Sequence, residues 1–427
     1  MKSRAPRLAL FAACGLEAMS YGAVYALLAQ LQRHYHLPTW GLGLIAGATF
    51  AAQLVAQLTL ARYADRGRAR LMLQGGVALA ALGVASFGLS SSLWQFVVSR
   101  ALLGLGSGIF LPAALRVVVA EAGDDTGEAM GRLMSVQVGG FVLGPPMGAL
   151  LNAAFGLRAP FFFQSLALVC CVPLLRLVRE PTVVDEHPPS GAIRRLLRIR
   201  PARAGLAIAA GTFVTMGTFE AIWARFMTDR GASPTAIALS VSLFALPLVF
   251  LAPRGGKVAD RVGPMRAAIV ALVALGCLQT LYAIPAPYWF SFTFSFAMAT
   301  VISICLPAGG AAMAEASPED LVGAGQGLYG ATGAGTAALA SVSAAALYGA
   351  LGASAMWLIV ATATLCGALA ARHAAGPLRT LAPGHGPHPA TEALAPAEGL
   401  LLMAAPDELL GPFGEGSGPP GQAGPPS

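Results

Sequence analysis

The chain has 427 residues, of which 56% are hydrophobic and only 11% are charged, and its net charge is +7. A soluble domain carries about 25% charged residues, so this composition leaves too little polar surface for a soluble fold of this length. No basic stretch is interleaved with aromatic residues, which argues against nucleic-acid binding. Composition and charge therefore indicate an integral membrane protein.

Apolar runs recur along the chain, and each is long enough to cross a hydrocarbon layer of about 30 Å as a helix. Spanning strands are excluded, because they need alternating polarity and these runs are apolar on every face. We predict an all-α integral membrane protein with twelve transmembrane helices. The predicted spans are residues 8–31, 40–60, 71–92, 94–119, 133–156, 159–178, 204–226, 235–253, 265–284, 288–312, 322–349 and 351–372.

The first span contains an acidic residue near the middle of the bilayer. Glu17 follows Arg7 by about 15 Å of helix, and Glu17, Tyr21 and Tyr25 share one helical face at intervals of four residues. A charge at this depth is costly unless it is paired or functional. We predict that Glu17 couples transport to protons; the alternative is a structural ion pair with Arg100.

The second span carries a similar polar stripe, which includes Gln53 and Gln57. We predict that both glutamines line the same cavity as the first-span stripe. Glu220 in span seven and Arg100 in span four are the other ionisable residues well inside the spans. For Glu220 the alternative is a place near water at the outer mouth, paired with Arg225 or Arg230.

Internal repetition predicts two related halves. The pair Asp-Arg at 65–66 recurs at 260–261, and Leu-Pro-Ala at 111–113 recurs at 306–308. Two further matches keep the same order and nearly the same interval: Ala-Glu-Ala at 120–122 recurs at 314–316, and Pro-Thr at 38–39 recurs at 234–235. We predict an N-terminal six-helix half at residues 1–178 and a C-terminal six-helix half at residues 204–372.

A basic linker at residues 179–203 joins the halves and ends in Arg-Arg-Leu-Leu-Arg-Ile-Arg. That ending is typical of a short amphipathic helix on the anionic inner leaflet; the alternative is a solvated charged linker. The tail at residues 373–427 is rich in Pro and Gly and is predicted to be disordered in the cytoplasm.

Lys and Arg residues gather on one side of the predicted membrane: at the N-terminus, between spans two and three, in the linker, and between spans eight and nine. By the positive-inside rule these segments are cytoplasmic, and both termini are cytoplasmic with them. The connections on the other side contain only Arg33, Arg158, Arg225 and Arg230.

The loops after spans two and eight share a motif, Ala-Asp-Arg followed by further basic residues, at 64–70 and 259–266. Both resemble the pattern G-x-x-x-D-R-x-G-R-R of the major facilitator superfamily, although Ala61 replaces the glycine in the first copy. The resemblance implies a twelve-helix transporter whose cytoplasmic side is held shut at these loops. The residues implied in gating are Asp65, Arg66, Arg116, Asp260 and Arg261; the alternative is that these charges only anchor the loops.

Two further motifs resemble this family. Span four carries Arg100 in the pattern R-x-x-x-G-x-G, and in this family spans one, four, seven and ten line the central cavity. Span five resembles the G-x-x-x-G-P-x-x-G motif of drug:proton antiporters, although a glycine-rich helix also serves as a packing face. The residues of that motif are Gly140, Gly144, Pro145 and Gly148.

We therefore predict a secondary active transporter that exports a small amphipathic or cationic compound in exchange for protons, by alternating access, as a monomer in the cell membrane. The alternative is an importer of the same fold or a transporter of lipid-like solutes. An enzyme is disfavoured, because no catalytic set lies within the spans, and ATP-driven transport is disfavoured, because no GxxxxGK[ST] loop occurs. The six cysteines lie in apolar runs without metal-binding spacing and are predicted to be buried, so we expect no metal or cofactor.

Overall fold

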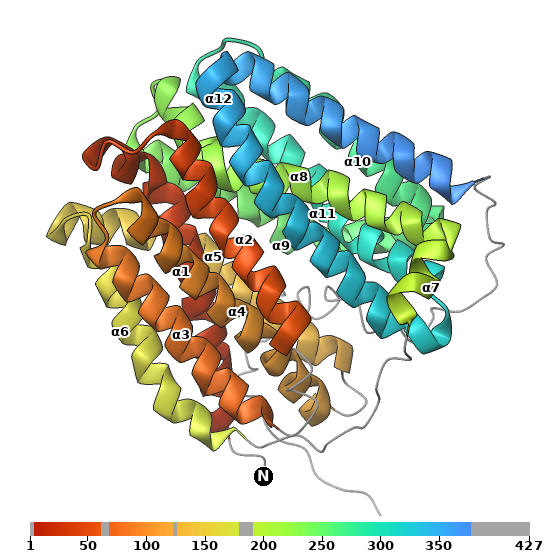
Figure 1. Ribbon diagram of the computed structural model, residues 1–427, viewed down its shortest axis with the longest axis horizontal. Helices are drawn as coiled ribbons and strands as arrows, with labels where there is room; N and C mark the ends of the chain where they lie inside the picture. The colour runs from red at the N-terminus through yellow and green to blue at the C-terminus, as the bar shows by residue number, and fades with distance from the viewer. Residues whose placement is uncertain (1–3, 61–67, 123–125, 179–190, 377–427) are drawn as a thin grey trace, which may run out of the picture.

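The computed structural model describes residues 4–60, 68–122, 126–178 and 191–376, and within these ranges all regular structure is helical. Figure 1 shows the long helices lying side by side in two groups. The first group contains α1 (Arg4–His34), α2 (Thr39–Leu60), α3 (Ala69–Leu89), α4 (Leu93–Ala122), α5 (Thr126–Phe155) and α6 (Ala159–Leu174). The second group contains α8 (Arg200–Asp229), α9 (Pro234–Val262), α10 (Pro264–Leu281), α11 (Tyr288–Ala316) and α12 (Val322–Ala375).

Among the described residues, ten helices are long and apolar enough to cross a membrane. One of them, α12, has 54 residues and turns back at Gly352, whose φ of 81° is accessible to glycine at little cost (Figure 1). α12 therefore contains the predicted spans eleven and twelve. Predicted span eight lies in α9, whose apolar stretch Pro234–Leu248 is shorter than the others. The arrangement is consistent with twelve spans.

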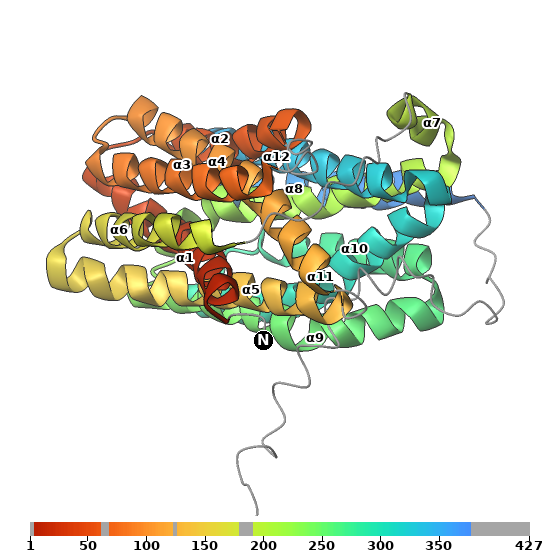
Figure 2. The ribbon, with the colours of Figure 1, turned by 90° about the horizontal axis from the view of Figure 1, so that it is seen from below.

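Helices pack within each group and also across the boundary between them (Figures 1 and 2). In the first group α1 packs on α5, α2 on α4, and α3 on α4 and α6. In the second group α8 packs on α12, and α11 packs on α9 and α10. Across the boundary α2 contacts α12, α5 contacts α9, and α1 contacts α8. The side chains at this boundary therefore hold the two groups against each other.

The two ends of the bundle are named here by the orientation that the charge pattern predicts. The predicted outer end holds the connections at residues 35–38, 90–92, 156–158, 230–233 and 282–287. The predicted inner end holds the beginnings of α3, α8, α10 and α12 and the ends of α9 and α11.

The cysteines are less uniformly buried than predicted. Cys170, Cys277 and Cys366 are exposed on the helix surfaces, so the prediction was wrong for these three. The outer faces of membrane helices contact lipid tails, and an apolar side chain needs no burial there. The other three, Cys14, Cys171 and Cys305, are buried.

Candidate functional site

An ion pair joins the two helix groups in the predicted outer halves of α4 and α8. Arg100 of α4 is 2% exposed, and its Nη2 donates to Oε1 of Glu220 on α8, which is 16% exposed. The structure thus pairs Glu220 with Arg100, and neither Arg225 nor Arg230 serves as its partner. A buried ion pair is strongly destabilised when one partner is removed, because an uncompensated charge remains.

Glu17 of α1 takes no part in this ion pair and instead forms a hydrogen bond with a serine of α4. Its side chain is 4% exposed, and its Oε1 accepts a hydrogen bond from Oγ of Ser107 on α4. Oγ of Ser107 accepts in turn from the hydroxyl of Tyr21, at 2.8 Å. A hydroxyl has one proton to donate and lone pairs to accept, so Ser107 satisfies both neighbours at once.

Tyr21 connects this carboxyl to the ion pair. The guanidinium carbon of Arg100 lies 5.3 Å from the centre of the Tyr21 ring, within the range of a cation–π contact. Contacts therefore run from Glu17 through Ser107 and Tyr21 to Arg100 and Glu220, and we call these five residues the polar network. The network contains two carboxyl groups and one guanidinium, so a single proton is enough to balance its charge.

The other predicted cavity residues make no hydrogen bond to the polar network within the described part of the chain. Tyr25 is half-buried one turn beyond Tyr21, and its ring packs edge-on against Phe141 of α5, at 6.3 Å between ring centres. Gln53 and Gln57 are half-buried on α2. Their place as solute contacts stays a prediction.

Sequence reasoning missed Ser107, although a signal was present. Ser107 follows Arg100 by seven residues and therefore lies on the same face of α4. Serine is also frequent at plain packing positions in membrane helices, so the spacing alone did not single it out.

The antiporter-type motif packs α5 directly against α1. A β-carbon on Gly140 would overlap the Gly15 backbone, and one on Gly144 would overlap the Met19 carbonyl. Gly148 lies against Ala23, and the Pro145 ring lies against Gly22. Small residues let helix backbones approach in this way, so the motif sets the position of the helix that carries Glu17. A role specific to antiport stays a prediction.

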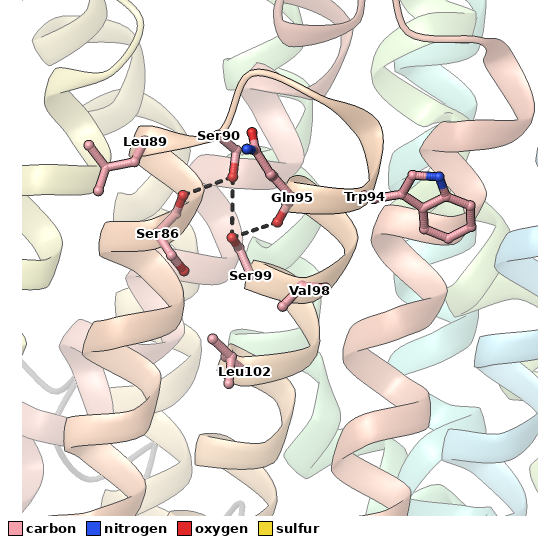
Figure 3. A pocket seen from close by; sticks show the side chains of 8 residues that line it. All are labelled: Ser86, Leu89, Ser90, Trp94, Gln95, Val98, Ser99 and Leu102. Atoms are coloured by element: carbon pink, nitrogen blue, oxygen red, sulfur yellow. Dashed lines mark hydrogen bonds between the residues drawn. The ribbon is translucent and has the colours of Figure 1, made fainter.

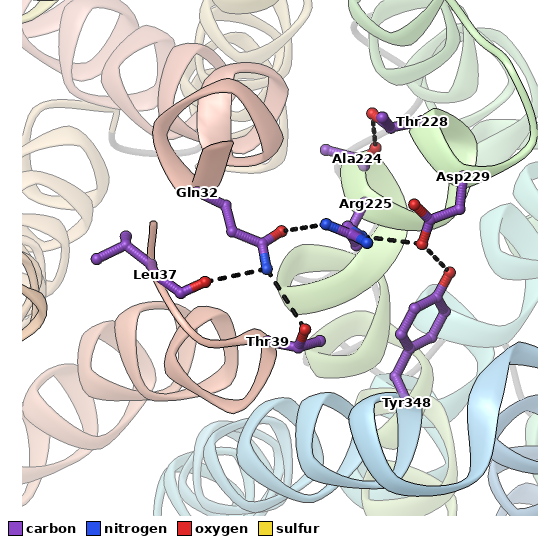
Figure 4. Close-up of polar contacts among 8 residues, drawn as sticks. All are labelled: Gln32, Leu37, Thr39, Ala224, Arg225, Thr228, Asp229 and Tyr348. Atoms are coloured by element: carbon purple, nitrogen blue, oxygen red, sulfur yellow. Dashed lines mark hydrogen bonds and ion pairs between the residues drawn. The ribbon is translucent and has the colours of Figure 1, made fainter. Parts of the chain in front are cut away.

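A second polar cluster joins the groups at the predicted outer end (Figure 4). Nη1 of Arg225 on α8 donates to Oε1 of Gln32 on α1 at 3.3 Å, and Nε of Arg225 bonds Oδ2 of Asp229 at 2.9 Å. The Tyr348 hydroxyl of α12 donates to the same carboxylate oxygen at 2.8 Å. The amide nitrogen of Gln32 donates a hydrogen bond to Oγ1 of Thr39 on α2 at 3.4 Å. We call these five residues the outer cluster.

Arg230 follows the end of α8 and binds the connection between α10 and α11. Its guanidinium donates to Oγ of Ser291 at 2.7 Å and to the carbonyls of Tyr282 and Ile284 at 2.8 and 2.7 Å. It also lies 4.1 Å from the centre of the Phe226 ring. Partial burial lowers the pKa of Arg230 from its ordinary value. Arg230 therefore holds this connection in place, and the ionic partner of Glu220 is Arg100.

A surface pocket lies between the predicted outer ends of α3 and α4 (Figure 3). Its serines bond to one another and to the backbone: Oγ of Ser90 donates to the Ser86 carbonyl at 2.8 Å, and Ser90 and Ser99 lie 3.2 Å apart. Trp94 and Val98 on its rim are exposed. The pocket lies on the face of α4 that carries these exposed side chains, and no hydrogen bond joins it to the polar network within the described structure. We do not count it as part of the candidate site.

The predicted gating residues are only partly described. Asp65 and Arg66 lie outside the described residues. Arg116 is half-buried on α4, Asp260 lies in the last turns of α9, and Arg261 is exposed beside it. Their role in gating stays a prediction.

Several curated proteins are similar to this chain. The multidrug resistance protein MdtG of Dickeya zeae (strain Ech586) is 29% identical over 276 residues, which are 62% of this chain and 66% of that protein. MdtG of Salmonella choleraesuis (strain SC-B67) is 28% identical over 249 residues, covering 56% of this chain and 61% of that protein. The chain thus matches slightly less than two thirds of the length of these relatives.

Solved structures share the fold. A bacterial homologue of the human lysosomal transporter Spinster, in an inward-facing and unoccupied conformation, matches 94% of this chain with a TM-score of 0.71 and 15% identity, and 99% of that chain is covered. The nucleoside transporter NupG matches 87% of this chain and 99% of its own, with a TM-score of 0.71 and 12% identity. The sequence model described as Major Facilitator Superfamily matches residues 10–225 and 205–404. The chain therefore belongs to the major facilitator superfamily of membrane transporters.

Proposed function

We propose that this protein exports a small amphipathic or cationic compound from the cytoplasm in exchange for protons. The observation that carries the proposal is the polar network, in which the Arg100–Glu220 ion pair crosses between the helix groups. Charges are rare inside membrane spans and usually mark ion or substrate pathways. The similarity to MdtG multidrug resistance proteins supports a drug-like substrate.

The network offers a physical link between proton binding and movement of the groups. Protonation of Glu220 removes the charge that holds Arg100, and this weakens a contact between α4 and α8. Protonation of Glu17 removes the negative charge at the end of the contacts that run through Ser107 and Tyr21 to Arg100. A proton at either carboxyl thus alters the free energy of the interface along which the groups separate during alternating access.

We assign the coupling proton to Glu17 and the inter-group contact to Glu220. Glu17 forms no ion pair within the described part of the chain, and its hydrogen bond with the neutral Ser107 hydroxyl persists when the carboxyl is protonated. Glu220, in contrast, loses an ion pair on protonation. We place both termini in the cytoplasm, and we place Asp65 and Arg116 at the inner closing contact.

Drug accumulation in cells tests the direction and the coupling. Cells that produce the protein should accumulate less of a cationic dye such as ethidium than cells without it. A protonophore should abolish the difference. Greater accumulation with the protein would indicate import, and a difference that persists with the protonophore would exclude proton coupling.

A further inference from the structure

The linker contains a short helix, α7 (Ala192–Arg198), that is held on the second helix group by one face. Leu196 is fully buried and Ala192 is nearly so, in a cluster with Met313, Leu321 and Tyr329. A seven-residue helix has little stability alone, so this packing is what holds it. Figure 2 shows α7 projecting at one end of the bundle, beside α8 and α12.

An ion pair adds a second attachment. Nη1 of Arg195 lies 2.6 Å from Oδ2 of Asp320, in the 3-10 turn that precedes α12. Both side chains are more than half exposed, so the pair contributes at most about 1 kcal/mol to stability. It nevertheless orients the helix, because it lies beside the buried Leu196.

The exposed face of α7 carries apolar side chains and basic side chains next to each other. Ile193 and Leu197 are 53% and 47% exposed and lie one turn apart, so they form an apolar stripe. Arg194 and Arg198 are exposed and form a basic stripe directly beside it. Exposed basic side chains continue into the first turn of α8, at Arg200 and Arg203. A solvated linker needs only the arginines and gains nothing from the two large apolar side chains.

We propose that this exposed face of α7 binds the anionic phospholipids of the adjacent membrane leaflet. The location fits, because the spanning helix α8 begins at Arg200, two residues after α7 ends, so α7 lies at the membrane boundary. The charge of the segment supports this, because Arg194 and Arg198 lie on the exposed face of α7, two more exposed arginines follow at 200 and 203, and the inner leaflet carries negative headgroups. The apolar stripe fits, because Ile193 and Leu197 reach the acyl boundary while the long arginine side chains extend to the headgroups.

The binding has a consequence for the second helix group. One extended residue, Ile199, joins α7 to α8, which carries Glu220, and Arg195 of α7 forms an ion pair with the turn that precedes α12. Anionic lipid on α7 therefore anchors the inner ends of two helices that line the boundary between the groups. This inference does not depend on the transported compound or on proton coupling.

Hydrogen exchange of the full chain in proteoliposomes tests the lipid contact. The amides of residues 192–198 should exchange about fivefold more slowly, or slower still, in vesicles with phosphatidylglycerol than in phosphatidylcholine alone, since one basic residue at an anionic surface contributes about that factor. The double variant Arg194→Gln/Arg198→Gln should lose the difference. The matched control Arg33→Gln/Arg158→Gln removes the same charge at the predicted outer end and should keep it.

Two results would overturn the proposal. Equal exchange of α7 in both kinds of vesicle would mean that this face is solvated. A lipid effect that survives in Arg194→Gln/Arg198→Gln would mean that the arginines do not bind the headgroups. The variant Ile193→Ser/Leu197→Ser measures the apolar contribution. Its α7 amides should exchange faster than those of the parent in vesicles with phosphatidylglycerol. High salt should speed their exchange more than it does in the parent, because only the arginines then hold α7 on the lipid.

Discussion

Arg225 of α8 donates a hydrogen bond to Gln32 of α1 at the predicted outer end, 3.3 Å between Nη1 and Oε1. The bond crosses from one helix group to the other, and Asp229 and Tyr348 support it from the second group. Two further hydrogen bonds cross the boundary, from Arg100 to Glu220 and from Ser242 to the Val142 carbonyl. We infer that the structure is closed at this end and that the outer cluster must break when it opens.

Loss of the outer cluster should favour the state open at the predicted outer end. Gln32→Ala removes the acceptor of Arg225, and a hydrogen bond to a charged group contributes about 1.5 kcal/mol or more. The ratio of the two states should shift about tenfold. Electron-spin distances between labels at Arg33→Cys and Thr235→Cys, in a cysteine-free background, measure this ratio.

Asn152→Ala is the matched control for that experiment. Nδ2 of Asn152 donates to Oε1 of Gln30 at 2.8 Å, and this bond joins α5 and α1, which both belong to the first group. Its loss should leave the label distances unchanged, because the bond does not cross the boundary. Identical distances in Gln32→Ala and the parent would show that the outer cluster does not hold this end closed.

Removal of Arg100 should impair both stability and transport. Arg100→Ala leaves the carboxylate of Glu220, which is 16% exposed, without its partner, at a cost of up to about 3–5 kcal/mol. The double variant Arg100→Ala/Glu220→Ala should recover much of the melting temperature and none of the transport. The surface change Arg158→Ala, which loses only a 3.3 Å bond to Tyr35, should leave both nearly unchanged. Mild effects of Arg100→Ala, equal to those of Arg158→Ala, would contradict a role in the cavity.

Ser107→Ala should disconnect Glu17 from Tyr21. The change removes the hydroxyl that donates to Glu17 and accepts from Tyr21. Loss of a hydrogen bond to a charged group changes an equilibrium constant or rate by roughly tenfold to hundredfold. We expect gradient-driven transport to fall by about tenfold or more, with Ser107→Thr closer to the parent. Ser99→Ala is the control, since Ser99 is equally buried on α4 but bonds only Ser90 and the Gln95 carbonyl. Equal rates for the two alanine variants would exclude Ser107 from coupling.

The sequence predicted the helices well, because hydropathy and length decide where a span lies. The predicted third span at 71–92 is α3 at Ala69–Leu89, whereas α5 begins at Thr126, before the predicted start of span five at 133, and α9 runs to Val262, past the predicted end of span eight at 253. Pairing was harder to predict. Arg100 had Glu17 as its expected alternative partner, but it pairs with Glu220. Periodicity identifies which residues share one face of a helix. It does not show which neighbouring helix that face contacts, because this depends on how the helices pack in three dimensions.

The glycines of α5 make a separate prediction about packing. Gly140→Leu forces a side chain into the Gly15 backbone of α1, and overpacking of this kind costs about 1–3 kcal/mol or more. The melting temperature of the purified protein should fall, and so should its yield in membranes. Gly139→Leu is the control, because a β-carbon at Gly139 meets no atom within 4 Å. Equal stability of the two variants would mean that α5 does not pack on α1 through the motif.

The remaining prediction assigns the coupling proton. Glu17→Gln keeps the size of the side chain and can still accept from Ser107, but it cannot bind or release a proton. In proteoliposomes it should retain exchange of substrate across the membrane without a gradient and lose transport driven by a pH gradient. Glu220→Gln, in contrast, weakens the contact with Arg100 and should slow both modes, because that contact belongs to the boundary between the groups.

The two variants separate a proton carrier from an inter-group contact, since only a proton carrier is dispensable for exchange without a gradient. The same measurements at several pH values sharpen the distinction: exchange by Glu17→Gln should be independent of pH over the range in which the parent varies. Gradient-driven transport that survives in Glu17→Gln and vanishes selectively in Glu220→Gln would place the coupling proton on α8. The Arg100–Glu220 ion pair would then itself be the group that binds the proton, and Glu17 would serve only to position Ser107 and Tyr21.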